Sequence, residues 1–205
     1  MSKCPYSGSS GELPPPYGSS DLTYNDYLKV SDLLKLQTPQ SDPAHHDEML
    51  FIVIHQAYEL WFKLVLHELQ SALAYMDEGK VLRAHHFVKR CVEIFRILVP
   101  QIHILETMTP IEFLEFRDHL NPASGFQSTQ FRELEFLAGL KDERYLKYFG
   151  DRPELLKTLR ARLEGRDLRT GFYELLSRSG FKMPKNAGAI DADTENPQRA
   201  EILQA

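Results

Sequence analysis

The chain has 205 residues, of which 42% are hydrophobic and 26% charged, as is typical of a soluble globular protein with one domain or at most two small ones. The formal net charge of −5 shows no basic excess, so a nucleic-acid-binding surface is not expected. No stretch of about 18 apolar residues lacks charges, and no apolar signal segment opens the chain, so we expect no membrane span and no signal peptide. The two cysteines, Cys4 and Cys91, do not suggest a disulfide framework, and the cytoplasm is the expected location.

Residues 1–20 are rich in Ser, Gly and Pro and are expected to form a flexible arm without a core of its own. Asp21 is a suitable N-cap for a first helix over residues 22–37. The sequence Thr38-Pro39 should end this helix, because the residue before a proline is disfavoured in the helical conformation. A folded helical domain is therefore expected over residues 21–183.

A loop over residues 40–45 leads to a long helix over 46–77, which contains no Gly or Pro and which Gly79 should stop. Apolar residues run almost all the way round this helix, so it is predicted to be central and buried. His55 lies inside the apolar run, with Phe51 one turn earlier on the same face. An imidazole beside an aromatic wall in a dry environment could hold a flat organic molecule. The commoner role of a lone histidine on an apolar face is that of a satisfied core residue, and both interpretations stay open.

The rest of the chain predicts further helices and no convincing strand or repeat, so the expected fold class is all-α, a multi-helix bundle. Pro100 should kink or split the first of these helices, and Pro153 suits the first turn of a later one. The expected helices cover 80–106, 109–120, 127–139, 142–148, 152–164 and 168–179. Residues 184–205 predict a loop and the start of a helix that stops at the last residue, so we expect a chain that has been cut or ends abruptly.

The sequence His45-His46-Asp47-Glu48 at the start of the long helix is a dense group of potential metal ligands. Adjacent helical residues point about 100° apart and do not converge easily on one ion. The plainer interpretation is a polar first turn whose acids face the helix dipole. The chain also lacks the Glu-x-x-His pairs of di-iron bundles, a zinc-protease motif, a Gly-rich phosphate loop and a Cys-x-x-Cys-His haem attachment site. We therefore expect no metal ligand in this chain.

Arg117 is a second candidate, at the end of a short predicted helix beside a loop over residues 121–125. Its guanidinium could clamp a carboxylate through two parallel hydrogen bonds. Alternatively, it forms a surface salt bridge with Glu115 or Asp118. The loop sequence Ser124-Gly125 could bring backbone N–H groups close to an anion, or it is only a turn.

Eight motifs occur in this chain in an order that resembles one enzyme family. They are Leu-Thr-Tyr at 22–24 with Tyr27-Leu28, His-Asp-Glu-Met-Leu-Phe-Ile at 46–52, His-Gln at 55–56, Glu-Leu-Trp at 59–61, Leu-Glu-Thr-Met-Thr-Pro at 105–110, Phe-Arg-Asp at 116–118, Pro-Ala-Ser-Gly-Phe-Gln-Ser at 122–128 and Gln-Phe-Arg-Glu-Leu-Glu-Phe at 130–136. Over most of residues 21–182 the chain resembles the tryptophan 2,3-dioxygenase family.

The resemblance implies a cytosolic, all-helical homotetramer that uses haem b iron and O₂ to cleave the indole C2–C3 bond of L-tryptophan. The product is N-formylkynurenine, the first intermediate of tryptophan catabolism by the kynurenine route. His55 would be the distal histidine that binds the indole N–H, Phe51 would pack on the indole, and Arg117 would pair with the substrate carboxylate. The other substrate-binding residues implied are Ile52, Val53, Ile54, Phe113, Ser124 and Gly125, together with Tyr24, Tyr27 and Leu28 on an N-terminal helix donated by a neighbouring subunit.

Two departures from the family pattern affect these expectations. Some members have Tyr at the position of Phe113, where the hydroxyl reaches the substrate carboxylate, so Arg117 would carry more of the clamp. The family's proximal, haem-ligating histidine has no counterpart among the eight histidines, so this chain could lose the haem. Either the chain is a truncated dioxygenase, which we favour, or it is a naturally short relative. The alternatives are a related haem-dependent aromatic monooxygenase and a haem-free helical module that binds an aromatic amino acid or a partner subunit.

Overall fold

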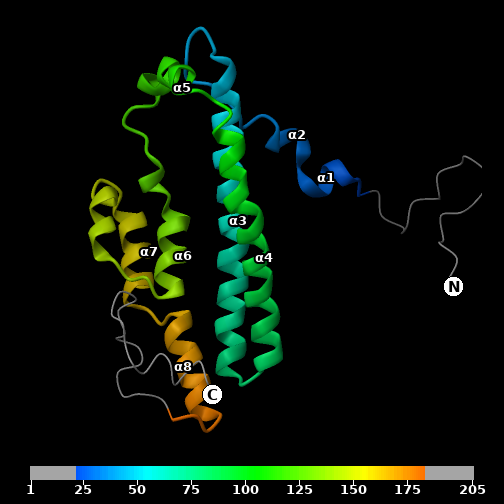
Figure 1. The fold of residues 1–205 in the computed structure, drawn as a ribbon, viewed down its shortest axis with the longest axis vertical. Coiled ribbons are helices and arrows are strands. Elements are labelled where there is room, and N and C mark those ends of the chain that lie inside the picture. The colour runs from blue at the N-terminus through cyan, green and yellow to red at the C-terminus, as the bar shows by residue number, and fades with distance from the viewer. Residues whose placement is uncertain (1–21, 183–205) are drawn as a thin grey trace, which may run out of the picture. The chain divides into compact units, whose positions relative to one another are not determined.

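The computed structural model describes residues 22–182, which fall into two compact units, one ending at Gln37 and one beginning at Thr38 (Figure 1). Within these residues the chain forms helices and loops and no strand, which confirms the predicted all-α class. The arm predicted over 1–20 and the segment predicted over 184–205 lie outside the described residues.

The first unit contains two short helices, α1 (Tyr24–Leu28) and α2 (Val30–Leu33), where the sequence predicts one helix over 22–37. Lys29 separates them in the left-handed conformation, with φ of 54°. Neither helix buries a residue, so no tertiary packing holds a longer helix together.

Thr23, rather than the predicted Asp21, is the N-cap of α1. Its hydroxyl oxygen accepts a hydrogen bond from the backbone N–H of Asp26 at 3.2 Å. Asp21 itself lies outside the described residues.

The second unit is built on two long helices, α3 (His46–Asp77) and α4 (Val81–Leu105), which run side by side (Figure 1). Two later helices, α6 (Thr129–Ala138) and α8 (Leu168–Arg178), also pack on α3. The helix α3 is therefore central, as predicted.

The turn between α3 and α4 follows the predicted chemistry. Gly79 has a φ of 71°, and the Lys80 N–H donates to the Tyr75 carbonyl at 2.9 Å, which closes the C-terminus of α3 in a Schellman-type turn. Pro100 lies inside α4 without splitting it, so the predicted helix over 80–106 remains one element.

The remaining elements are short and end near the predicted positions. Ser128 is the N-cap of α6, so this helix begins at Thr129 and not at 127. The segment predicted as helix over 142–148 is a 3₁₀ helix. In chain order, the elements not yet given are α5 (Pro110–Arg117), η1 (Asp118–Leu120), η2 (Gly125–Gln127), η3 (Glu143–Phe149) and α7 (Pro153–Glu164), the last with Pro153 in its first turn as predicted.

The main core lies where α3, α4 and α6 meet, on the second half of α3. Val65, Leu98 and Leu137 are at most 2% exposed there. Each such side chain stabilises the fold by about 1.5–3 kcal/mol through burial, so this contact fixes α3 as a rigid support.

The prediction that α3 is buried all round is wrong for its first half, where Val53 is 46% and Leu60 55% exposed. By length and composition α3 is also apolar enough to cross a membrane, although the sequence predicts no membrane span. However, α3 buries the carboxylates of Glu48 and Glu68, and both have hydrogen-bond partners within the bundle. These features are those of the central helix of a bundle.

Candidate functional site

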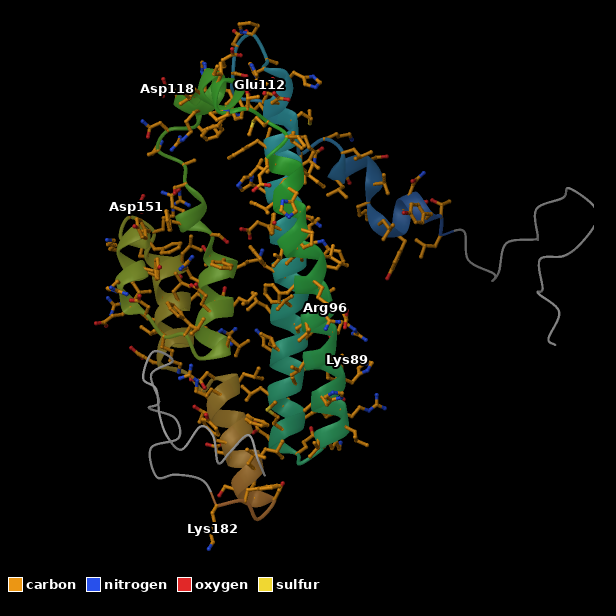
Figure 2. All side chains as sticks on the ribbon, in the orientation of Figure 1. Lys89, Arg96, Glu112, Asp118, Asp151 and Lys182 are labelled. Atoms are coloured by element: carbon orange, nitrogen blue, oxygen red, sulfur yellow. The ribbon has the colours of Figure 1, made fainter. Side chains whose placement is uncertain are left out.

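A cleft of about 590 Å³ lies beside the first half of α3. Its other walls come from α5 and from the segment that leads into α6, so residues far apart in the sequence meet around it. Figure 2 shows the side chains of α5, between the labelled Glu112 and Asp118, at the end of the bundle where α3 begins. The lining residues are Phe51, Ile52, His55, Gln56, Glu59, Phe113, Arg117, Leu120, Ala123, Ser124, Gly125, Gln127 and Ser128.

Two other hollows, of about 220 and 510 Å³, lie on η3 and α7 and contain none of the predicted site residues. The cleft beside α3 is therefore the candidate site.

The imidazole of His55 is held in one tautomer by its own helix. Its Nδ1 lies 2.7 Å from the backbone carbonyl oxygen of Phe51, and a carbonyl can only accept, so Nδ1 carries the hydrogen. In the neutral ring Nε2 then has a lone pair and can accept a hydrogen bond from a ligand N–H. The prediction of a dry environment is wrong for the described residues, since His55 is exposed where the cleft opens beside it.

Phe51 forms the aromatic wall that the sequence predicts. Its ring centroid lies 4.1 Å from that of His55 and 5.7 Å from those of Phe113 and Phe116. Phe116 is fully buried, so this cluster anchors α5 on α3. Each aromatic pair contributes about 0.5–1.5 kcal/mol beyond its buried area, which keeps the wall in place.

Of the three residues that follow Phe51 in the chain, only Ile52 lines the cleft. Ile54 is 6% exposed and belongs to the core, whereas Val53 points away from the core and is 46% exposed. Successive residues of a helix are about 100° apart, so three in a row cannot share one face. The structure therefore does not bring Val53 and Ile54 to the cleft.

Arg117 makes no hydrogen bond or ion pair with any described residue through its guanidinium. Glu115, which the sequence offers as a partner, contacts the imidazole of His45 instead. The side chain of Arg117 is half-buried at the cleft, so its five donors are available to an anionic ligand. The salt-bridge interpretation is therefore wrong for the described part of the chain.

The Ser124–Gly125 segment is a capped turn. The Ser124 N–H donates to Oε1 of Gln127 at 3.1 Å, and the Phe126 N–H donates to Oγ of Ser124 at 3.3 Å. Because these amides are used within the turn, the structure favours the turn over an anion-binding loop. Gly125 faces open space, since a Cβ added there would meet no atom within 4 Å.

The polar turn at the start of α3 has a structural role beyond the predicted interaction of its acids with the helix dipole. Glu48 is fully buried and accepts hydrogen bonds from the backbone N–H groups of Gln40 and Ser41 at 2.6 and 3.0 Å. Burial alone would raise the pKa of Glu48, but these hydrogen bonds outweigh it and lower the pKa. Within residues 22–182 no three His, Cys, Asp or Glu side chains form a metal-ligand group.

The sequence did not predict Glu59 as a site residue, although it lines the cleft. It accepts hydrogen bonds from Oγ of Ser128 and from Nε2 of Gln130. One signal could have found it, because Glu59 follows His55 by four residues and shares its helical face.

The residues predicted to serve a neighbouring subunit lie in the first unit. Tyr24 is 75%, Tyr27 72% and Leu28 44% exposed there. Their own unit therefore leaves them uncovered.

Comparison with known proteins agrees with the predicted resemblance. A family model described as tryptophan 2,3-dioxygenase matches residues 16–164. A tryptophan 2,3-dioxygenase of Nocardioides sp. is 50% identical over 181 residues, which are 86% of this chain and 65% of that protein. Those of Xanthomonas euvesicatoria and Xanthomonas oryzae are 44% identical over 170 residues, 83% of this chain and 57% of each relative. The chain thus spans less than two thirds of these relatives' length. Since the matched residues make up well over half of its own length, the chain belongs to the tryptophan 2,3-dioxygenase family.

Proposed function

We propose that this chain forms the substrate-binding side of a tryptophan 2,3-dioxygenase, which cleaves the indole C2–C3 bond of L-tryptophan with O₂. The observation that carries the proposal is the cleft itself. It combines a guanidinium that pairs with no described residue, an aromatic wall and an imidazole whose Nε2 can accept, which complement the carboxylate, the ring and the N–H of the substrate.

In this proposal the chain binds and orients the substrate. Arg117 donates two parallel hydrogen bonds to the carboxylate, and Nε2 of His55 accepts the indole N–H. Phe51 packs against the indole ring, and Phe113 adds apolar surface without a hydroxyl. Holding both ends of the substrate fixes the direction of the C2–C3 bond and lowers the entropy cost of the reaction.

The family implies a haem, and the cleft offers it an incomplete set of residues. When bound, haem iron supplies the activation of O₂. Haem iron takes an axial ligand such as His, Cys, Met or Tyr, and among the described lining residues only His55 is of this kind. Because the proposal assigns His55 to the substrate, no axial ligand remains in the described cleft. The residues present therefore fit the substrate and do not fit a complete haem site.

The same observation favours a second candidate function, a haem-free module that binds an aromatic amino acid. The cleft would bind L-tryptophan in the same way in this case, and no oxygen chemistry would follow.

We further propose that the chain assembles as a homotetramer in the cytoplasm, as the family resemblance implies. The support is the set of uncovered apolar side chains on α1 and on the first half of α3, which includes Tyr24, Tyr27 and Val53. Burial of such side chains against further copies would remove them from water.

Isothermal titration of the purified chain with L-tryptophan tests the proposed function. We expect binding by the parent, and weaker binding by Arg117→Lys, which keeps the charge and loses the fork geometry. Arg96→Lys is the matched control, since Figure 2 shows Arg96 on α4, well away from α5. Equal affinity of the parent and the Arg117→Lys variant would contradict the clamp.

The two candidate functions differ in haem content and product. A shift of the Soret band of free haem when the chain is added, together with N-formylkynurenine detected by mass spectrometry, would support the dioxygenase with an axial ligand from outside the described cleft. Tryptophan binding with an unchanged Soret band and no product would support the haem-free module.

A further inference from the structure

Glu59 connects the two walls of the cleft. Ser128 donates from Oγ to Oε1 of Glu59 at 2.6 Å. Nε2 of Gln130 donates to Oε2 at 2.8 Å and to the Glu59 carbonyl oxygen at 2.9 Å. Both carboxylate oxygens are therefore used, and hydrogen bonds to a charged acceptor are about twice as strong as neutral ones.

Ser128 links Glu59 to the Ser124–Gly125 loop, which forms the second wall of the cleft. Its Oγ accepts the Phe131 N–H at 3.1 Å as the N-cap of α6 while it donates to Glu59. Its own N–H donates to the Gly125 carbonyl at 3.1 Å. A displacement of Ser128 therefore displaces Gly125.

The loop has few other attachments within the described residues. The hydrogen bonds of residues 121–127 remain among residues 118–128. Phe126 stacks on Tyr148 of η3 with ring centroids 5.7 Å apart. The loop is thus held between η3 on one side and, through Ser128, Glu59 of α3 on the other.

We propose that Glu59 is a positioning residue that sets the separation between the His55 wall and the Ser124–Gly125 wall. This inference rests on the proposed function, because the indole of that function's substrate would lie between the two walls. The carboxylate acts through Ser128 and does not touch the substrate. Without this contact the loop becomes ordered only when the substrate binds, and the entropy cost of that ordering weakens the affinity.

The test combines titration with L-tryptophan and hydrogen exchange of backbone amides, both on the full chain. Glu59→Gln keeps the size of the side chain, but an amide has one acceptor oxygen where the carboxylate has two, so Ser128 or Gln130 loses its acceptor. We expect L-tryptophan to bind about tenfold more weakly, as for the loss of one hydrogen bond to a charged group. We also expect faster exchange at the amides of residues 124–128, with a thermal midpoint within about 3 °C of the parent.

Two variants of Ser128 separate this contact from the helix cap. Ser128→Asp keeps a good capping oxygen but has no hydroxyl to donate and faces Glu59 with a like charge, so it should weaken binding. Ser128→Thr keeps both the cap and the hydroxyl, so it should recover the affinity that Ser128→Asp loses. Glu93→Gln, at an exposed carboxylate of α4, is the matched control for Glu59→Gln.

Parent-like affinity and exchange in both Glu59→Gln and Ser128→Asp would overturn the proposal. A loss of affinity in Arg117→Lys in the same assay would still leave the proposed function standing. If the parent itself does not bind L-tryptophan, the proposed function fails, and exchange at residues 124–128 decides the role of Glu59. Unchanged exchange in Glu59→Gln would then overturn that role.

Discussion

The second half of α3 forms the main core with α4 and α6, whereas its first half lines a cleft whose other walls are α5 and the segment that leads into α6. Both halves are rich in apolar residues. In the second half these residues form the core, as Leu69 does at 5% exposure. In the first half Phe51 and Ile52 line the cleft. The elements that lie opposite a helix, and not its own hydropathy, decide whether its side chains form a core or a binding site.

The two halves are also held in different ways. The second half forms the main apolar core, whereas the first half combines the aromatic cluster of Phe51, Phe113 and Phe116 with polar contacts. These polar contacts join Glu48 to the 40–41 backbone, His45 to Glu115, and Glu59 to Ser128. Four substitutions test this difference.

Leu69→Ala should have the largest effect, a loss of about 3 kcal/mol of unfolding free energy, because it leaves a cavity in the packed half. Urea denaturation followed by circular dichroism measures it. The affinity of the folded protein for L-tryptophan should stay unchanged. If Phe51→Ala in the cleft half costs as much stability as Leu69→Ala, the contrast between the halves is wrong.

Arg117→Ala should weaken L-tryptophan binding by about 1.5–3 kcal/mol, since it removes hydrogen bonds to a charged group. Isothermal titration measures the loss. The free energy of unfolding should not fall, because the guanidinium has no ion-pair partner among the described residues. A marked destabilisation would show that Arg117 supports the fold and would weaken the distinction between the halves.

Glu48→Gln should cost about 1–2 kcal/mol at neutral pH, because an amide cannot accept from both Gln40 and Ser41 as a carboxylate does. The folded pKa of Glu48 lies below its usual 4.5, so Glu48 stabilises the fold above that pH and loses this contribution as the pH falls through the folded pKa. Urea unfolding from neutral pH down to about pH 3.5 should show a flatter acid decline in the variant. An identical decline in parent and variant would contradict this, with Glu93→Gln as the exposed control.

His55→Phe should have the smallest effect, about 0.5–1.5 kcal/mol in L-tryptophan affinity, because it keeps an aromatic ring and removes one neutral acceptor. The analogue 1-methyl-L-tryptophan lacks the indole N–H, so parent and variant should bind it alike. Titration of both proteins with both ligands gives the difference. An equal loss for the two ligands would show that the imidazole does not bind the N–H.

Local signals predicted much of the fold. The helix over 46–77, the stop at Gly79 and the start at Pro153 each depend on residues within a few positions of the boundary, and all three are confirmed. The break at Lys29 was not predictable from spacing, because the helix fails there for lack of packing.

Only those residues of the site that belong to the family motifs were predicted from the sequence. The motifs pointed to Phe51, His55 and Arg117, and the structure brings these three together. The exposure of His55 depends on how a distant loop is placed. The contact between Glu59 and Ser128 spans 69 positions, so no local pattern reveals it.

Neither the backbone conformation nor the surrounding packing requires a glycine at position 125. Its φ lies outside the left-handed region, and a Cβ would meet only open space. Because Gly125 lines the cleft, a Cβ at this position would change the border of the cleft without clashing with any described residue. This position offers a way to change the ligands that the protein accepts while leaving its stability largely untouched.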